Sequence, residues 1–281
     1  MTNFEILKFS IDLLAVLLLA LGIKGLSKVR SAREANRLAA LAMALAVVGV
    51  LVDSLSNSII PLNSFVWISI GALVGGLLGL LTAQRVPMTA MPETVALFNG
   101  CGGMSSLLVA IGVALFPLES KTTGITSSLV ETISILVSIF VGAITFTGSL
   151  VAMAKLQGWL STPNWVQSKL RHAVNIGFSI LALVASVEFL KGGESGLWLL
   201  IIGSGLLGIG VTLPIGGADM PVVISLLNSY SGVAAAAAGF VVGSQLLIVA
   251  GAMVGAAGLI LTQVMCKGMN RSLVSVLFGG A

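Results

Sequence analysis

The polar side chains that could carry chemistry are gathered in one segment, residues 216–240, with the sequence GGADMPVVISLLNSYSGVAAAAAGF. A short loop containing Asp219 leads through Pro221 into an otherwise hydrophobic helix. This helix carries Ser225, Asn228, Ser229 and Tyr230. Hydroxyl and amide groups surrounded by hydrocarbon need hydrogen bonds to protein or to water. Such groups can hold and orient water, which is the chemistry of a path for protons or small polar solutes.

The amino-acid composition indicates whether this helix is surrounded by water or by lipid. Of the 281 residues, 57% are hydrophobic and 9% are charged, and the mean hydropathy is +1.12. A water-soluble surface of ordinary polarity cannot be built from these residues. The sequence therefore predicts an all-α integral membrane protein that contacts the lipid bilayer.

Hydrophobic runs of about 20 residues, the length that crosses a bilayer, alternate with turn-forming or charged residues. Nine such runs predict a bundle of nine transmembrane helices in a single domain, residues 1–281. The runs lie near residues 8–27, 37–55, 63–83, 94–117, 127–154, 172–190, 196–214, 221–241 and 244–266. The last three are joined by very short connections, so we expect a tight antiparallel bundle there.

The positions of the basic residues predict the orientation, because short cytoplasmic loops retain Lys and Arg. An N-terminus outside and a C-terminus in the cytoplasm place eleven of the fourteen basic residues on the inner side. These are Lys24, Lys28, Arg30, Arg33, Arg37, Arg85, Lys155, Lys169, Arg171, Lys267 and Arg271. The Asp219 loop is then cytoplasmic, where a solvated aspartate is the ordinary expectation. The net charge of +4 reflects this topology and does not indicate nucleic-acid binding.

Three of the predicted helices have narrow polar faces at helical spacing. The faces comprise Asn99, Gly102, Gly103 and Ser106; Ser138, Gly142, Thr145, Ser149 and Ala152; and Ser225, Asn228, Ser229, Gly232, Ala236 and Gly239. Turned toward one another, they could enclose a column of water, since none carries a permanent charge that would trap an ion.

Two other interpretations of these faces remain open. Ser, Thr and Asn commonly join membrane helices by hydrogen bonds without any transport role, which would make the chain a scaffold. The same faces could also serve a secondary transporter or a channel for a small neutral solute. Glycines at four-residue spacing, at 71, 75 and 79 and at 251 and 255, are expected to let helices pack closely.

Few titratable side chains lie within the predicted spans. Asp12 and Glu131 are within about two turns of the outer surface, and Glu131 is a candidate for the outer entrance of a path. His172 is the single histidine and is expected at the inner interface. Cys101 and Cys266 are expected to be buried thiols, and their spacing predicts no metal site.

Several segments resemble, in the same order, the membrane domain of the beta subunit of proton-translocating NAD(P) transhydrogenase. The strongest is residues 216–240, and LGIKGLSKVRSAREANR is similar to that family's first loop. The others are QRVPMTAMPETVALFNGCGG (84–103), TFTGSLVAMAKLQG (145–158), RHAVN (171–175) and CKGMNRS (266–272).

In that family, hydride passes between NADH and NADP+ on two soluble nucleotide domains while the membrane domain moves a proton inward. The resemblance implies that Ser149 and Asn228 line the proton path, and we expect Asn99 and Ser225, from the same polar faces, to line it with them. It also implies that the loop, through Asp219 and with it Arg271, communicates with the NADP-binding domain. NAD(H) and NADP(H) would be bound by partner domains, with no cofactor or metal on this chain.

The family often has a histidine in its fourth span, and Asn99 occupies that position here. An amide orients water but does not take up a proton near neutral pH. The resemblance therefore implies that the proton acceptor lies on an alpha-subunit helix packed against Asn99 and Asn228.

Beta subunits of the family continue beyond this domain into an NADP-binding domain. The sequence ends at MNRSLVSVLFGGA, so we expect that domain on a separate polypeptide or in a part of the protein missing here. It would sit at the cytoplasmic face. The family further implies a homodimeric complex with alpha subunits in a bacterial inner membrane.

Overall fold

The computed structural model describes residues 3–26, 30–56, 62–116, 125–163, 166 and 170–278, and helices make up nearly all of them. Nine helices in these ranges are long and apolar enough to cross a membrane, and no strand occurs among them. The predicted all-α transmembrane architecture is confirmed. Lys28, Lys121 and Lys169 lie outside the described residues.

The helices agree with the predicted spans in number and order, and most begin earlier or end later than predicted. They are α1 (Asn3–Leu26), α2 (Ala32–Ser56), α3 (Leu62–Arg85), α4 (Met91–Leu115), α5 (Ile125–Leu156), α6 (Leu170–Leu190), α7 (Glu194–Thr212), α8 (Met220–Val242) and α9 (Gln245–Gly268). The short helices are η1 (Met88–Ala90), η3 (Gly217–Asp219) and α10 (Leu273–Phe278). Charged residues extend the helices beyond their apolar runs, as Arg85 and Lys155 do in the last turns of α3 and α5.

The chain divides into two compact units, Met1–Thr89 and Ala90–Ala281. In the first unit α1 packs against α2. Gly25 permits this approach, because a Cβ atom there would come within 2.7 Å of the Ala35 Cβ. A Cβ at Gly71, Gly75 or Gly79 of α3 would meet nothing within 4 Å.

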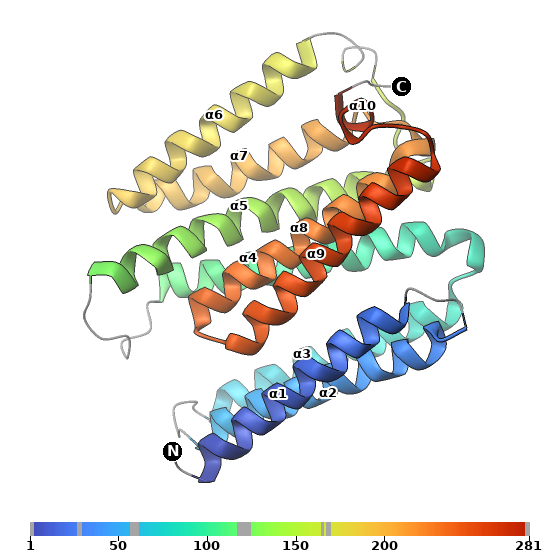
Figure 1. Ribbon diagram of the computed structural model, residues 1–281. Coiled ribbons are helices and arrows are strands. Elements are labelled where there is room, and N and C mark those ends of the chain that lie inside the picture. The colour runs from blue at the N-terminus through green and yellow to red at the C-terminus, as the bar shows by residue number, and fades with distance from the viewer. Residues whose placement is uncertain are drawn as a thin grey trace. The chain divides into compact units, whose positions relative to one another are not determined.

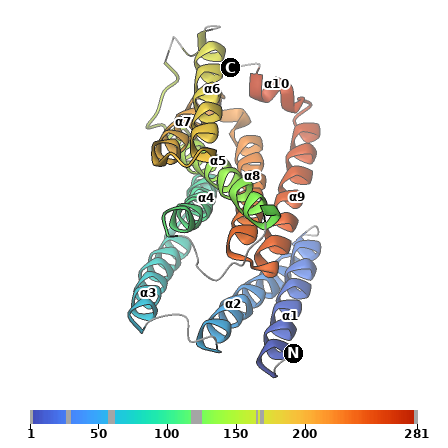
Figure 2. The ribbon, with the colours of Figure 1, turned by 90° about the vertical axis from the view of Figure 1, so that its left-hand side faces the viewer.

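The second unit is arranged around α5 and α8 (Figure 1, Figure 2). Helix α5 contacts α4, α7 and α8, while α8 contacts α4, α5 and α9, and α6 pairs with α7. The α8–α9 connection is short because Gly243 adopts a left-handed conformation, φ 74°, and Ser244 caps α9 by accepting a hydrogen bond from the Leu247 N–H. All of the candidate path and loop residues lie in this unit.

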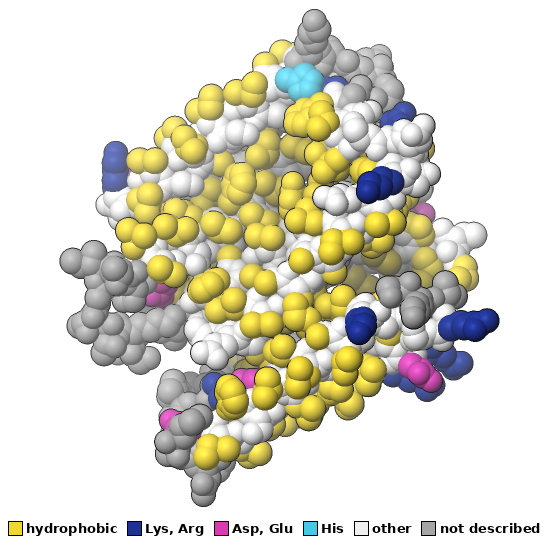
Figure 3. Space-filling view, in the orientation of Figure 1, with side chains coloured by type: hydrophobic (Ala, Val, Ile, Leu, Met, Phe, Trp, Pro, Cys, Tyr) yellow, Lys and Arg dark blue, Asp and Glu magenta, His cyan; other side chains and the backbone are white. Residues whose placement is uncertain are grey.

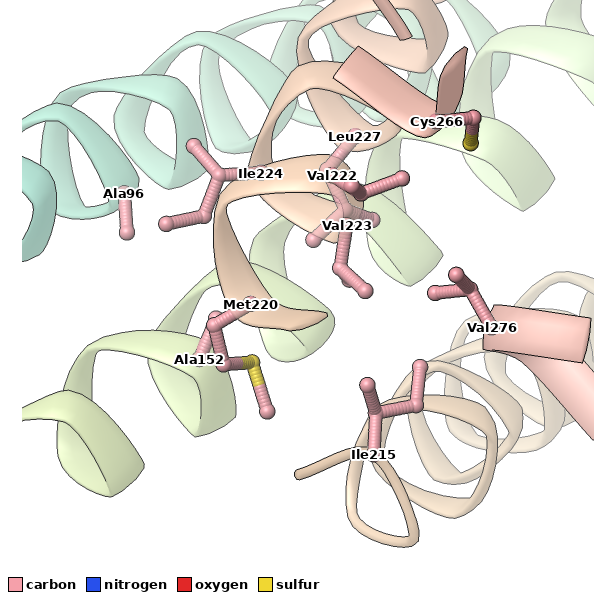
Figure 4. Close-up of a cluster of buried hydrophobic side chains, with 10 residues drawn as sticks. All are labelled: Ala96, Ala152, Ile215, Met220, Val222, Val223, Ile224, Leu227, Cys266 and Val276. Carbon is pink, nitrogen blue, oxygen red and sulfur yellow. The ribbon is translucent and has the colours of Figure 1, made fainter. Parts of the chain in front are cut away.

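Two large apolar clusters fill the second unit, and a small third one consists of Val151, Val166 and Leu213. One contains ten side chains from α4, α5, α8, α9, α10 and the α7–α8 loop, and Figure 4 shows Met220 beside Ala152 with Ile215 and Val276 on the loop side. The other includes Leu107, Ile139 and Leu200. Many large apolar side chains are also exposed, and Figure 3 shows hydrophobic side chains over the face in view, as lipid requires of a membrane surface. Of the two cysteines, Cys266 is buried as expected, but the expectation for Cys101 is wrong because it is exposed on α4.

Candidate functional site

Asn99 on α4 and Ser149 on α5 form a buried amide–hydroxyl pair. The Asn99 Nδ2 group donates a hydrogen bond to Ser149 Oγ at 3.1 Å, and Ser149 is fully buried. The helices can approach this closely because glycines face the contact. A Cβ at Gly100 would lie 3.1 Å from the Ser149 Cβ, and one at Gly103 would lie 2.8 Å from the Thr145 Cβ. The structure thus brings together two of the predicted path residues.

The other end of the same amide has no hydrogen-bond donor. Asn99 is only 8% exposed, and its Oδ1 atom is buried and accepts no hydrogen bond from the described residues. A buried amide oxygen left in this state destabilises a fold by about 1–3 kcal/mol. The atom is therefore suited to accept a hydrogen bond from water or from a donor on another chain.

Ser138 joins the same helices at a second level. Its Oγ atom donates to the Ser106 carbonyl at 3.1 Å and to the Ala234 carbonyl at 3.3 Å, so one hydroxyl links α5 to both α4 and α8. Both partners are backbone atoms. This side chain holds the three helices together and directs its only proton to backbone carbonyls.

The hydroxyls of α8 are turned toward α9. Ser225 Oγ donates to the Gly258 carbonyl at 3.2 Å and accepts from Thr262 Oγ1 at 3.1 Å, and Ser229 Oγ donates to the Gly255 carbonyl at 2.7 Å. Ser225 is therefore not bonded to the Asn99–Ser149 pair. Sequence reasoning did not include Thr262, although its four-residue spacing from Gly258 on one helix face could have indicated it.

Asn228 lies on α8 beside these serines and is half-buried. In the part of the chain that the structure describes, its amide makes no side-chain hydrogen bond. The amide keeps its hydrogen-bonding capacity for water or for a neighbouring chain.

Asp219 ends η3 and forms an ion pair with Arg271. Arg271 Nη1 lies 2.5 Å from Asp219 Oδ2; the carboxylate side chain is 10% exposed and the guanidinium side chain 45%. The expectation of a solvated Asp219 is wrong, because apolar residues such as Met220 and Ile215 pack around the loop and leave Asp219 buried. The pair connects the α7–α8 loop to the turn between α9 and α10.

Lys155, in the last turn of α5, was not singled out from the sequence as a site residue. Its Nζ atom donates three hydrogen bonds of 2.7 Å each, to the carbonyls of Leu213 and Ile215 and to Thr162 Oγ1. A lysine at a helix end gives no sequence signal of this role, because two of its three acceptors are backbone atoms about 60 residues away.

Two residues at the start of α6 contact the last residue of α10. Arg171 at the start of α6 donates to the Phe278 carbonyl at 2.6 Å, and the ring of His172 lies 6.3 Å from that of Phe278. His172 is thus placed at an end of the bundle, and its position at the inner interface stays a prediction.

Glu131 lies on α5 toward the helix end opposite to Lys155. The 18 residues between Glu131 and Ser149 correspond to about 27 Å along the helix. Within the described residues, no group of His, Cys, Asp and Glu side chains could hold a metal ion. Among the described residues, the site offers hydrogen bonds and the Asp219–Arg271 ion pair.

This fold, with apolar helices of spanning length around a few buried polar side chains, is that of a multi-pass membrane protein. The sequence model of the NAD(P) transhydrogenase beta subunit family matches residues 9–281. Two relatives from Rhodospirillum rubrum, both named NAD(P) transhydrogenase subunit beta, are each 43% identical over 273 residues. The chain belongs to the NAD(P) transhydrogenase beta subunit family. The match covers 95% of this chain and 57% of each relative, so the chain spans little more than half their length.

Proposed function

We propose that this chain forms the proton-conducting membrane part of a proton-translocating NAD(P) transhydrogenase. A proton would move inward as hydride passes from NADH to NADP+ on attached soluble domains. The observation that carries the proposal is membership of the beta subunit family along residues 9–281. In this assignment NAD(H) and NADP(H) are bound by partner domains, and the chain contributes the path and its coupling to those domains.

The proposed path follows Asn99, Ser149, Asn228 and Ser225, with Glu131 at its outer entrance. The pairing of Asn99 with Ser149 and the free Oδ1 atom support the inclusion of Asn99. The half-buried amide of Asn228 supports a wettable surface on α8. Because neither amide titrates near neutral pH, these side chains orient water while the proton-binding group belongs to an alpha-subunit helix beside them.

Coupling to the NADP-binding domain is assigned to the Asp219–Arg271 pair. An ion pair between a loop and a neighbouring turn has two discrete arrangements, closed and open. A nucleotide-binding domain on the cytoplasmic face can favour the closed or the open arrangement if, in a given nucleotide state, it contacts one more strongly than the other. The loop would then change the hydrogen bonds along α5 and α8, and with them the side to which the path opens.

The arrangement in the cell follows from the same proposal. The N-terminus lies outside and the C-terminus in the cytoplasm, as the basic residues predict. The complex contains alpha subunits, whose helices pack against Asn99 and Asn228, and an NADP-binding domain at the cytoplasmic face. It works as a homodimer in a bacterial inner membrane.

The proposal is tested in the assembled complex reconstituted into liposomes. Asn99→Leu removes both hydrogen-bonding atoms of the amide at similar volume, and Ser138→Ala is the matched control, a buried hydroxyl bonded only to backbone. Asn99→Leu should lower proton uptake driven by hydride transfer about tenfold or more, whereas Ser138→Ala should retain it. A complex that transfers hydride without moving protons would refute the proposal. Solute flux through this chain alone would favour a channel or secondary transporter.

A further inference from the structure

Helix α5 carries both a path residue and a loop anchor. Ser149, which holds Asn99, and Lys155, which holds the α7–α8 loop, are six residues apart on one continuous helix. This separation is about 9 Å along the helix axis. Any shift or rotation of this part of α5 therefore moves both contacts together.

Two of the acceptors of Lys155 are carbonyls that have few other hydrogen-bond donors available to them. Helix α7 ends at Thr212, and the carbonyls at a helix C-terminus have no partner within the helix. Leu213, Pro214 and Ile215 are all buried, so solvent does not reach this stretch freely. An ammonium group is a favourable donor here, because it supplies three N–H groups and complements the negative end of the α7 dipole.

The third acceptor comes from another segment. Thr162 follows a turn after α5 in which Gly158 has φ 73°, so the chain folds back toward Lys155. One side chain thus ties the end of α5 to the linker that follows it and to the loop before α8. An interfacial lysine that only marks topology is surrounded by water; Lys155 is half-buried and all three of its N–H groups are bonded.

The anchored loop reaches Asp219 within four residues of Ile215. Ile215 and Met220 belong to one buried cluster with Ala152 of α5, so the loop is packed on both sides of Asp219 (Figure 4). Displacement of Asp219 by a change at Arg271 is therefore resisted at the carbonyls that Lys155 holds. The contacts Arg271–Asp219, Ile215–Lys155 and Ser149–Asn99 form a continuous series along the chain and α5.

We propose that Lys155 is a positioning residue for proton coupling, which fixes the Asp219 loop to α5 and so connects the Asp219–Arg271 ion pair to the Asn99–Ser149 pair. The inference rests on the proposed function. Lys155 itself need not touch the proton, because its role is to make loop and helix move as one body.

Lys155→Met tests this role, since it keeps most of the length of the side chain and removes every donor. Lys267→Met is the matched control, an exposed lysine in the last turn of α9. In the complete complex, hydrogen exchange of the amides in residues 213–220 should be about tenfold faster in Lys155→Met than in Lys267→Met. Exchange in α4 and α9 should not change. Protons moved per hydride transferred should fall in Lys155→Met and stay at the wild-type value in Lys267→Met.

Lys155→Arg keeps the charge and several donors, so it should restore most of the exchange protection and of the proton-to-hydride ratio. Lys155→Gln, which keeps two donors, provides the same comparison if the Met variant does not assemble. A looser loop with an unchanged proton-to-hydride ratio would overturn the coupling role, and unchanged loop exchange would overturn the anchor. Absence of proton movement in the wild-type complex would instead refute the proposed function, and the exchange result would still decide whether Lys155 holds the loop.

Discussion

Asn99 Nδ2 lies 3.1 Å from Ser149 Oγ, and this hydrogen bond uses one of the amide's two polar atoms to join α4 to α5. The other atom, Oδ1, is buried and has no donor among the described residues. One side chain therefore serves both the packing of the bundle and a contact that a further donor must complete. The substitutions below separate these two uses.

Ser149→Ala removes the acceptor of the amide and leaves Asn99 Nδ2 buried without a partner. We expect a loss of about 1–3 kcal/mol in stability, the typical effect of an unsatisfied buried group. Proton translocation should fall in the same variant, because the amide is no longer held in one orientation. Thermal unfolding of the purified complex and dye-monitored proton uptake in liposomes measure the two effects.

Ser149→Thr is the informative companion of that variant, because it keeps the hydroxyl. The extra methyl group meets the close α4–α5 contact at Gly100, so stability should fall while the amide still has an acceptor. If Ser149→Thr retains coupled proton movement and Ser149→Ala loses it, the hydroxyl is responsible. Equal loss in both would assign the effect to packing.

Because Asp219 and Arg271 form an ion pair, we expect the effects of substituting them on coupled proton movement to be non-additive. Asp219→Asn and Arg271→Gln each break the same ion pair, so the double variant should reduce coupled proton movement no further than the more severe single variant does. Lys267→Gln, combined with Asp219→Asn, is the control and should give additive effects. Additivity of the Asp219 and Arg271 substitutions would mean that the two residues act separately. The measurement is a double-mutant cycle on the rate of proton uptake.

Gly232→Ala should disrupt the second unit. A Cβ at this position would lie 2.7 Å from the Gly255 Cα, and backbone atoms cannot move aside without separating α8 from α9. Gly177→Ala on the exposed face of α6 is the control, since a Cβ there meets nothing within 4 Å, and alanine favours a helix over glycine by up to about 1 kcal/mol. The yield of monodisperse complex in detergent should fall for the first variant and not for the second.

The nine helices could be predicted because each hydrophobic run has the length that a bilayer requires and ends at turn-forming or charged residues. The spacing of Gly251 and Gly255 predicted close packing of their helix, which is confirmed, and the structure identifies α8 as the neighbour. The spacing at Gly71, Gly75 and Gly79 has the same pattern, yet within the described residues of the first unit a Cβ at these positions meets no neighbour. Spacing alone therefore identifies a surface that permits close packing and does not identify its partner.

The polar contacts were only partly predictable. Helical periodicity put Ser225, Ser229 and Asn228 on one face, but the rotation of α8 against α9 directs the two hydroxyls to α9 carbonyls. That rotation is set by the packing of the two helices against each other. It cannot be read from the sequence periodicity of either helix alone. The role of Lys155 could not be predicted for a related reason, since two of its three acceptors are main-chain oxygens of a distant loop.

Asn228→Leu distinguishes a wetted path from a packing face. The amide makes no side-chain hydrogen bond within the described residues, so the substitution breaks no internal hydrogen bond there and adds apolar surface of similar volume. The thermal stability of the complex should stay the same or rise. Coupled proton uptake should fall about tenfold or more, because the side chain can no longer orient water.

Ser229→Ala is the opposite case and serves as the comparison for Asn228→Leu. Its hydroxyl donates to the Gly255 carbonyl at 2.7 Å, so its removal should lower stability by about 1 kcal/mol and leave the proton-to-hydride ratio unchanged. Retained coupling in Asn228→Leu would remove this amide from the path. Ser229 is bonded to α9 and Asn228 is not, so the two variants should differ in coupling. Loss of coupling in both would mean that the α8 face acts by packing helices together.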